Sequence, residues 1–152
     1  MESDNGVPKM SWVKAFEQEL HDKYDAPAKG AVAQFVEAKC GTDVVPNPDQ
    51  YGVDLLVMHR GKIVGAIEVE VRQWYPTCPF PTIHVPQRKE KYFNPTTLFF
   101  ALTKDMLHAY WIETKYISEF PVKEVRNIKV SSGEMFFDVP TVKFNYVDLC
   151  KP

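Results

Sequence analysis

The sequence predicts a single mixed α/β domain, in which helices cover a central sheet of about five strands. Three observations lead to this fold class. Residues 27–41 repeat apolar side chains at helical spacing, residues 51–73 alternate apolar and polar side chains around a turn, and residues 96–103 form an apolar run of strand length. A chain of 152 residues is long enough for one domain with a real core.

Two helices are expected early in the chain, after a tail at residues 1–10 that we expect to be flexible. Ser11 can cap the first helix, which runs to about Tyr24 with apolar side chains at i, i+4 spacing. Pro27 can start the second helix and Gly41 can end it. The expected buried side of the second helix consists of Ala28, Ala31, Val32, Phe35, Val36 and Ala38.

The hairpin at residues 51–73 contains acidic residues at positions that demand an explanation. In its second strand, apolar residues alternate with Glu68, Glu70 and Arg72, so the two glutamates share one face. Removing two carboxylates from water in so apolar a strand is costly unless a cation offsets their charge. A divalent cation is the candidate that this pattern favours.

The turn of this hairpin decides whether Asp54 joins the glutamates. Arg60-Gly61-Lys62 predicts a three-residue loop with Gly61 in the left-handed conformation. In that register Asp54 lies directly opposite Glu68, with Cβ atoms roughly 4.5–5.5 Å apart. A two-residue loop would turn Asp54 to the other face, so the prediction of a site requires a loop of three or five residues. Asp54, Glu68 and Glu70 would then bind Mg²⁺, or Mn²⁺, through oxygen ligands.

The rest of the chain predicts loops, a basic helix and further strands. Three prolines make residues 74–85 a long, stiff loop, and a short helix over 86–93 follows it. The run at 96–103 is expected to be a central strand buried on both faces, with the next strand at 108–112. Beyond these we expect a short helix near 114–120, an irregular stretch at 121–130 that can include a strand, and late strands or a docking arm at 135–139 and 142–147.

Composition excludes several classes of protein. No apolar run approaches the roughly 20 residues that span a membrane, and the polar, acidic N-terminus does not resemble a signal peptide. Cys40, Cys78 and Cys150 lie far apart, which argues against a zinc site or a disulfide framework and favours the reducing cytoplasm. The net charge of −2 means that any nucleic acid must be bound by a local basic patch.

Carboxylate-bound Mg²⁺ can neutralise a scissile phosphate, activate a water and stabilise the leaving oxygen during phosphodiester hydrolysis. On these residues the chain resembles the PD-(D/E)XK nuclease superfamily, the fold of many restriction enzymes and Holliday-junction resolvases. The resemblance covers roughly residues 11–112 and rests on GVDLLV, a hairpin turn and AIEVEVR, followed by TTLFFALT and HAYWI. It implies a restriction-endonuclease-like core, Mg²⁺-dependent cleavage of DNA and a homodimer or larger homo-oligomer.

The resemblance also assigns roles to residues. Asp54 and Glu68 match the family's aspartate and its (D/E). Glu70 stands where the family lysine is usual, a change also seen in some restriction enzymes, and it would be a third ligand or bind the attacking water. Lys89 of the basic helix would replace that lysine. Pro48-Asp49 is a literal PD, but it lies in turn chemistry, so Asp54 is preferred.

An acid of the first helix, Glu17 or Glu19, would also join the site by this resemblance. The residues expected to contact the substrate are Arg72, Gln73, His84, Arg88 and Lys91. Alternatives stay open for each group. Glu68 and Glu70 could form a solvated face paired with Arg72, the basic helix could be only a solvated surface, and His84 could be an ordinary loop histidine.

The function that these predictions favour is a metal-dependent nuclease acting on DNA, either structure-specific or similar to resolvases and restriction enzymes. The alternative is a catalytically inactive module with the nuclease fold, which serves DNA binding or protein assembly and in which Glu70 marks a decayed site. A third hypothesis is a phosphatase or another metal hydrolase with a small substrate.

Overall fold

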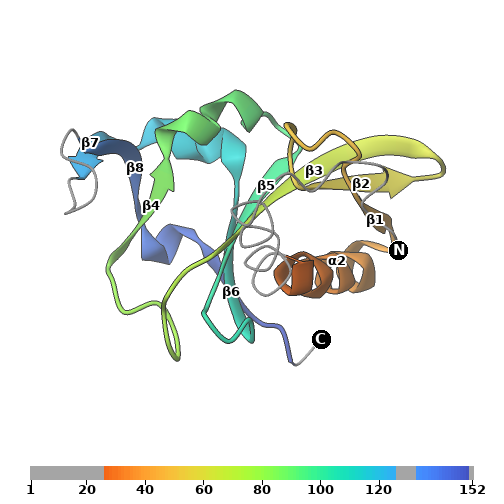
Figure 1. The fold of residues 1–152 in the computed structure, drawn as a ribbon, viewed down its shortest axis with the longest axis horizontal. Helices are drawn as coiled ribbons and strands as arrows, with labels where there is room; N and C mark the ends of the chain where they lie inside the picture. Colours follow the sequence, from red (N-terminus) through yellow and green to blue (C-terminus); the bar gives the residue numbers. More distant parts are fainter. Residues whose placement is uncertain (1–25, 126–132, 151–152) are drawn as a thin grey trace, which may run out of the picture.

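The computed structural model of this protein describes residues 26–125 and 133–150 (Figure 1). The predicted tail, the predicted helix over 11–24, and with it Glu17 and Glu19, lie outside the described residues. No helix within the described ranges is both long enough and apolar enough to cross a membrane.

The described part of the chain forms two sheets, and the larger has six strands in the order β1-β2-β3-β5-β6-β9. β3 and β5 are parallel, whereas the other neighbours are antiparallel, so the predicted mixed α/β class is confirmed with one strand more than expected. The strand bounds are Asp43–Pro46 (β1), Leu55–His59 (β2), Lys62–Val71 (β3), Thr97–Leu102 (β5), His108–Glu113 (β6) and Asn145–Asp148 (β9). β5 lies inside the sheet and is buried on both faces, as its apolar run predicts.

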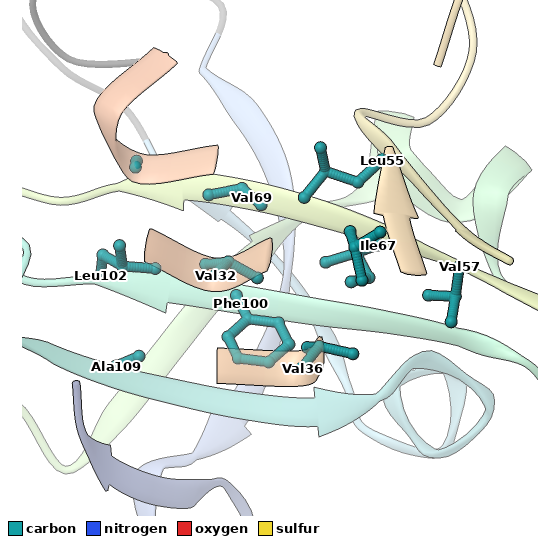
Figure 2. Close-up of a cluster of buried hydrophobic side chains, with 11 residues drawn as sticks. Val32, Val36, Leu55, Val57, Ile67, Val69, Phe100, Leu102 and Ala109 are labelled. Atoms are coloured by element: carbon teal, nitrogen blue, oxygen red, sulfur yellow. The ribbon is translucent and has the colours of Figure 1, made fainter. Parts of the chain in front are cut away.

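Helix α2, Ala26–Cys40, covers one face of this sheet. Its buried side chains are Ala28, Val32 and Val36, whereas Ala38 is exposed, contrary to the prediction. Gly41 ends the helix at a φ of 68°, and its N–H donates to the carbonyl of Glu37. Figure 2 shows Val32 and Val36 of α2 against Ile67 and Phe100 of the sheet, the centre of the first core.

A second, three-stranded sheet covers the opposite face, where flanking helices were expected. Its order is β4-β8-β7, with bounds Thr82–Pro86 (β4), Glu134–Pro140 (β8) and Val122–Val125 (β7). The prediction of a loop throughout 74–85 is therefore wrong at its end, and residues 121–130 do include a strand. Within residues 26–125 and 133–150, three 3-10 helices accompany the strands: η2 (Gln87–Tyr92), η3 (Thr114–Glu119) and η4 (Thr141–Lys143). The second core lies between the two sheets and includes Ile83, Val85, Phe99, Ile112, Phe137 and Val139.

The hairpin of β2 and β3 reaches the predicted register by an unexpected route. His59 pairs with Lys62, so the loop has two residues, Arg60 and Gly61, both with positive φ. The prediction of an odd loop is wrong. A bulge corrects the register, because Val57 pairs with Gly65 while Met58 pairs with Ile63, which leaves Val64 as an extra residue on β3. Leu55 therefore pairs with Ile67, and Asp54 reaches Glu68 as the metal hypothesis requires.

Gly65, next to this bulge, allows β3 to approach the chain before β5. A Cβ atom at Gly65 would lie 2.9 Å from the carbonyl oxygen of Thr96, which also accepts a hydrogen bond from Ala66. We therefore expect Gly65→Ala to lower the free energy of unfolding by about 1–3 kcal/mol, measured by urea denaturation.

The matched control is Gly30→Ala in α2, where an added Cβ meets nothing within 4 Å. That change should raise the free energy of unfolding by up to about 1 kcal/mol, because alanine is the better helix former. Equal effects of the two substitutions would show that the close approach at Gly65 does not constrain the fold.

Candidate active site

The candidate site lies on the face of the large sheet that the small sheet covers. Strand alternation sends Ile67 and Val69 into the core beneath α2 and turns Glu68 and Glu70 to the opposite face. Glu68 pairs with Phe99 of β5 and is only 3% exposed, so it is not part of a solvated face. Glu70 is half-buried at the outer end of the same row.

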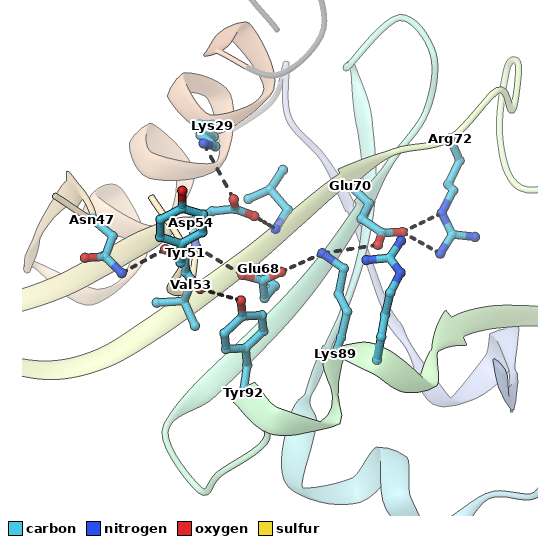
Figure 3. Close-up of polar contacts among 12 residues, drawn as sticks. Lys29, Asn47, Tyr51, Val53, Asp54, Glu68, Glu70, Arg72, Lys89 and Tyr92 are labelled. Atoms are coloured by element: carbon cyan, nitrogen blue, oxygen red, sulfur yellow. Dashed lines mark hydrogen bonds and ion pairs between the residues drawn. The ribbon is translucent and has the colours of Figure 1, made fainter. Parts of the chain in front are cut away.

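Two reciprocal hydrogen bonds hold Asp54 against Glu68. The backbone N–H of Asp54 donates to Glu68 Oε2 at 3.1 Å, and the backbone N–H of Val69 donates to Asp54 Oδ2 at 2.8 Å. We call these two bonds the Asp54–Glu68 clasp (Figure 3). Strand β2 begins only at Leu55, so the Asp54 side chain supplies the acceptor that the Val69 N–H lacks on that side of β3. The clasp thereby fixes two carboxylates side by side.

Lys89 reaches the same acids from η2. Its Nζ lies 2.6 Å from Glu68 Oε1 and 3.4 Å from Glu70 Oε2, so the ammonium group bridges the two glutamates. Contacts on both sides position η2. The hydroxyl of Tyr92 donates to the carbonyl of Tyr51, near Asp54, and the ring of Phe93 packs against Phe137 of the small sheet. The helix is thus tied to both parts of the fold that meet at the site.

Positive side chains flank the acids at both ends of the row (Figure 3). Lys29 of α2 lies 3.5 Å from Asp54 Oδ1. At the other end, Arg72 donates from Nε and Nη2 to Glu70 Oε1, at 3.0 and 2.8 Å, and from Nη2 to the carbonyl of His84 at 2.6 Å. The ion pair of Arg72 with Glu70, which belongs to the alternative interpretation, is therefore present. As these side chains stand, no three acidic, histidine or cysteine residues of the described ranges are grouped closely enough to hold a metal ion.

Burial raises the pKa of Glu68 above its ordinary value, and the nearby charge of Asp54 raises it further. The hydrogen bond and the charge of Lys89 act in the opposite direction but do not reverse the shift. Burial lowers the pKa of Lys89, yet its hydrogen bond to Glu68 and the charges of the three acids outweigh burial and raise it. Burial is thus the largest cause of the shift of Glu68, whereas the neighbouring acids cause the shift of Lys89.

The other predicted substrate contacts lie around this centre. His84 belongs to β4, and its Nε2 lies 3.1 Å from Asp138 Oδ1 of the small sheet. Arg88 is exposed and pairs with Glu134 at 3.0 Å, while Lys91 extends over the ring of Tyr92. Gln73 is exposed just after β3.

The literal Pro48-Asp49 lies in a turn, as expected. The Asp49 carboxylate accepts from the Tyr51 N–H, in the turn that precedes Asp54. Lys29 is the contact that sequence reasoning missed. A lysine beside buried Ala28 on a helix carries no signal of its acidic partner, because that contact depends on how α2 packs across the sheet.

A groove of about 430 Å³ opens directly beside Glu70. It runs between the end of β3 and the small sheet, and its polar walls are Glu70, Arg72, Arg88 and Glu134. The two arginines are paired with the two acids of the same groove, Arg72 with Glu70 and Arg88 with Glu134, so these charges balance.

Lys89→Met tests whether the ammonium group offsets the buried charge, since methionine retains most of the side-chain length. At pH 8 the free energy of unfolding should fall by roughly 3 kcal/mol, because Glu68 loses its partner. The pKa of Glu68 should rise further above its unfolded value of 4.5. A raised folded-state pKa gives a contribution that is present below the unfolded pKa and is lost as pH rises through the folded pKa.

The stability gap between wild type and this variant should therefore narrow as the pH is lowered toward about 5. Urea denaturation between pH 8 and about pH 5 measures this difference in the free energy of unfolding. Lys91→Met on the same helix is the control, since Lys91 is exposed and no contact to Asp54, Glu68 or Glu70 is found for it. A gap that does not change with pH would contradict the assigned charge balance.

In comparisons with known proteins, no family model matches this chain and no curated protein matches it. Any functional proposal therefore rests on the residues of the site, their geometry and their charges.

Proposed function

We propose that this domain is a metal-dependent endonuclease that hydrolyses phosphodiester bonds of DNA with Mg²⁺ or Mn²⁺. One observation carries the proposal: Asp54 is held against Glu68, and Lys89 bridges Glu68 and Glu70 beside a groove whose polar walls are two arginines and two acids. The E-x-E pattern and the hairpin that bears it resemble the PD-(D/E)XK superfamily, and a restriction-endonuclease-like core is part of the proposal.

The acids of the site fit a divalent cation in their chemistry. Asp54, Glu68 and Glu70 offer the oxygen ligands that Mg²⁺ and Mn²⁺ prefer. Burial raises the pKa of Glu68 even with Lys89 in contact, so an added cation would favour the ionised form of this carboxyl group. Asp54 and Glu68 would hold the ion, with Glu70 as third ligand or as the residue that orients a water. When bound, such an ion neutralises phosphate charge and lowers the pKa of a bound water.

Lys89 is suited to stabilise charge on the reacting phosphate. Its raised pKa keeps it protonated at neutral pH, so it acts as a cation and hydrogen-bond donor and not as a base. Its ammonium group sits on a flexible stem that can turn from a carboxylate to a phosphate oxygen. The proposal requires this movement, because in the structure the ammonium group occupies the space between Glu68 and Glu70.

Arg72 and Arg88 would hold the DNA backbone in the groove beside Glu70. Arg88 can exchange its partner for a phosphate more easily than Arg72, because its ion pair with Glu134 is exposed to solvent. The Arg72 side chain is held by hydrogen bonds to Glu70 and to the carbonyl of His84. One small domain contacts only part of a duplex, so we propose that a homodimer or a larger homo-oligomer binds the DNA.

A second candidate function is favoured by the same ion pairs. Each of the three carboxylates already contacts a cationic side chain: Lys29 for Asp54, Lys89 for both glutamates, and Arg72 for Glu70. Such a row can be stable without a metal ion. The domain would then be an inactive module that binds DNA or assembles with other proteins, and Lys89 would be a permanent counter-ion.

Incubation with supercoiled, linear, single-stranded and branched DNA, with and without Mg²⁺ or Mn²⁺, tests both functions. A nuclease should cut at least one of these substrates only when the metal is present. Glu68→Gln should lower that rate by about 100-fold or more, because it removes a metal-binding charge while retaining the side-chain shape.

The control is Glu90→Gln, an exposed acid on η2 beside Lys89. It should leave cleavage unchanged. Cleavage by Glu68→Gln at the wild-type rate would remove Glu68 from the mechanism, and a wild-type protein that cuts none of the substrates would favour the inactive module.

A further inference from the structure

A second pocket lies on the other side of Arg72 from the groove. It has a volume of about 240 Å³ and is lined by Arg72, Trp74, Phe80, Pro81, Thr82 and His84. Arg72 lines both the groove and this pocket, so its side chain forms the wall that they share. The guanidinium carbon lies 5.6 Å from the centre of the Trp74 ring.

Hydrogen bonds hold the loop that forms this pocket in one shape. The carbonyl of Trp74 accepts from the Lys104 N–H at 2.9 Å, and the Cys78 N–H donates to the hydroxyl of Tyr110 at 3.1 Å. Thr141 holds the loop's far end, where its hydroxyl donates to the carbonyl of Phe80 and its N–H to the carbonyl of Pro81, both at 2.8 Å. The pocket is therefore formed before any ligand arrives.

Phe80 is the side chain that this arrangement leaves without a structural explanation. It is 57% exposed, whereas Trp74, on the same loop, is 7% exposed and belongs to the second core. The backbone bonds of the loop fix the position of Phe80 although little of its ring is buried. A long ordered loop that presents an aromatic ring to solvent beside a candidate site is typical of a binding element.

The lining suits a flat, partly polar ring. Phe80 contributes an exposed aromatic ring, Pro81 an apolar side chain, and Arg72 a guanidinium group that is paired with Glu70. Stacking of bases on aromatic side chains is tolerant of sequence, because every base has a π-face. The pocket is also adjacent, across Arg72, to the groove that we assign to the DNA backbone.

We propose that this pocket binds one unpaired nucleobase of the strand whose backbone lies in the groove, a proposal that rests on the function proposed above. A base inside a duplex is stacked and paired and cannot enter such a pocket without being flipped out. The preferred substrate is therefore DNA with single-stranded or unpaired nucleotides next to the cut, not a continuous duplex.

Binding measurements test this inference separately from cleavage. Fluorescence anisotropy would compare a labelled single-stranded oligonucleotide with a duplex of the same length, using the full chain and no divalent metal. Phe80→Ala should weaken single-strand binding by roughly 5- to 100-fold and leave duplex binding nearly unchanged. Phe80→Leu, which keeps the apolar bulk without the ring, should lose most of the same affinity, and Phe80→Tyr should retain it.

Tyr116→Ala is the control, because Tyr116 is a similarly exposed aromatic on η3 that does not line the pocket. Thermal unfolding of each variant confirms that the fold is intact. Unchanged single-strand affinity in Phe80→Ala, or equal losses on both DNAs, would overturn the assignment of the pocket. Loss of single-strand affinity in a protein that cuts no DNA would support the pocket and refute the nuclease, so the two failures are distinguishable.

Discussion

The buried charge of Glu68 is the constraint on which the arrangement of this site depends. A carboxylate that is 3% exposed is costly to ionise unless donors and cations surround it. The Asp54 N–H and the Lys89 ammonium group meet that demand from opposite sides, one from the segment before β2 and the other from η2. Burial raises the pKa of Glu68, whereas the hydrogen bond to Glu68 and the charges of the three acids raise the pKa of Lys89 against the effect of burial.

The site lies at the edge of the second core, on a sheet that α2 covers on one face and the small sheet covers on the other. On the face beneath α2, Ile67 and Val69 enter an apolar core, and on the opposite face Phe99 enters the core beneath the small sheet. Glu68 neighbours Phe99 on that face. Beside Glu68, the sheet is covered by charged side chains of η2 and of the groove instead of apolar side chains. Function is therefore proposed where the second core ends, which is also where an extended ligand could reach the sheet.

Local signals predicted much of this structure from the sequence. Apolar periodicity identified α2, β5 and β6, and alternation identified β3 with both glutamates on one face. The approach of Asp54 to Glu68 was predicted from register, but for the wrong reason, since a two-residue turn and a bulge at Val64 give the register assigned to a longer loop. A two-residue turn followed by a bulge gives the same register as a three-residue loop without a bulge. The residues of the turn alone therefore do not show which of the two forms.

What could not be predicted depends on contacts between distant parts of the chain. The prolines of residues 74–85 obscured β4, whose partner β8 lies more than fifty residues later, for example His84 opposite Asp138. The contact of Lys29 with Asp54 depends on how α2 packs, and no local pattern reports it. The restriction-endonuclease-like core, the metal and the nuclease activity remain predictions.

Whether a metal ion binds between Asp54, Glu68 and Glu70 distinguishes a catalytic site from a row of ion pairs that is stable without metal. Anomalous diffraction from crystals soaked in Mn²⁺ tests this most directly, because the signal locates the ion itself. We expect a peak in contact with carboxylate oxygens of Asp54 and Glu68, with the Lys89 ammonium group displaced from its position between the glutamates. Absence of a peak at saturating Mn²⁺, with Lys89 still bridging Glu68 and Glu70, would contradict a metal-dependent site.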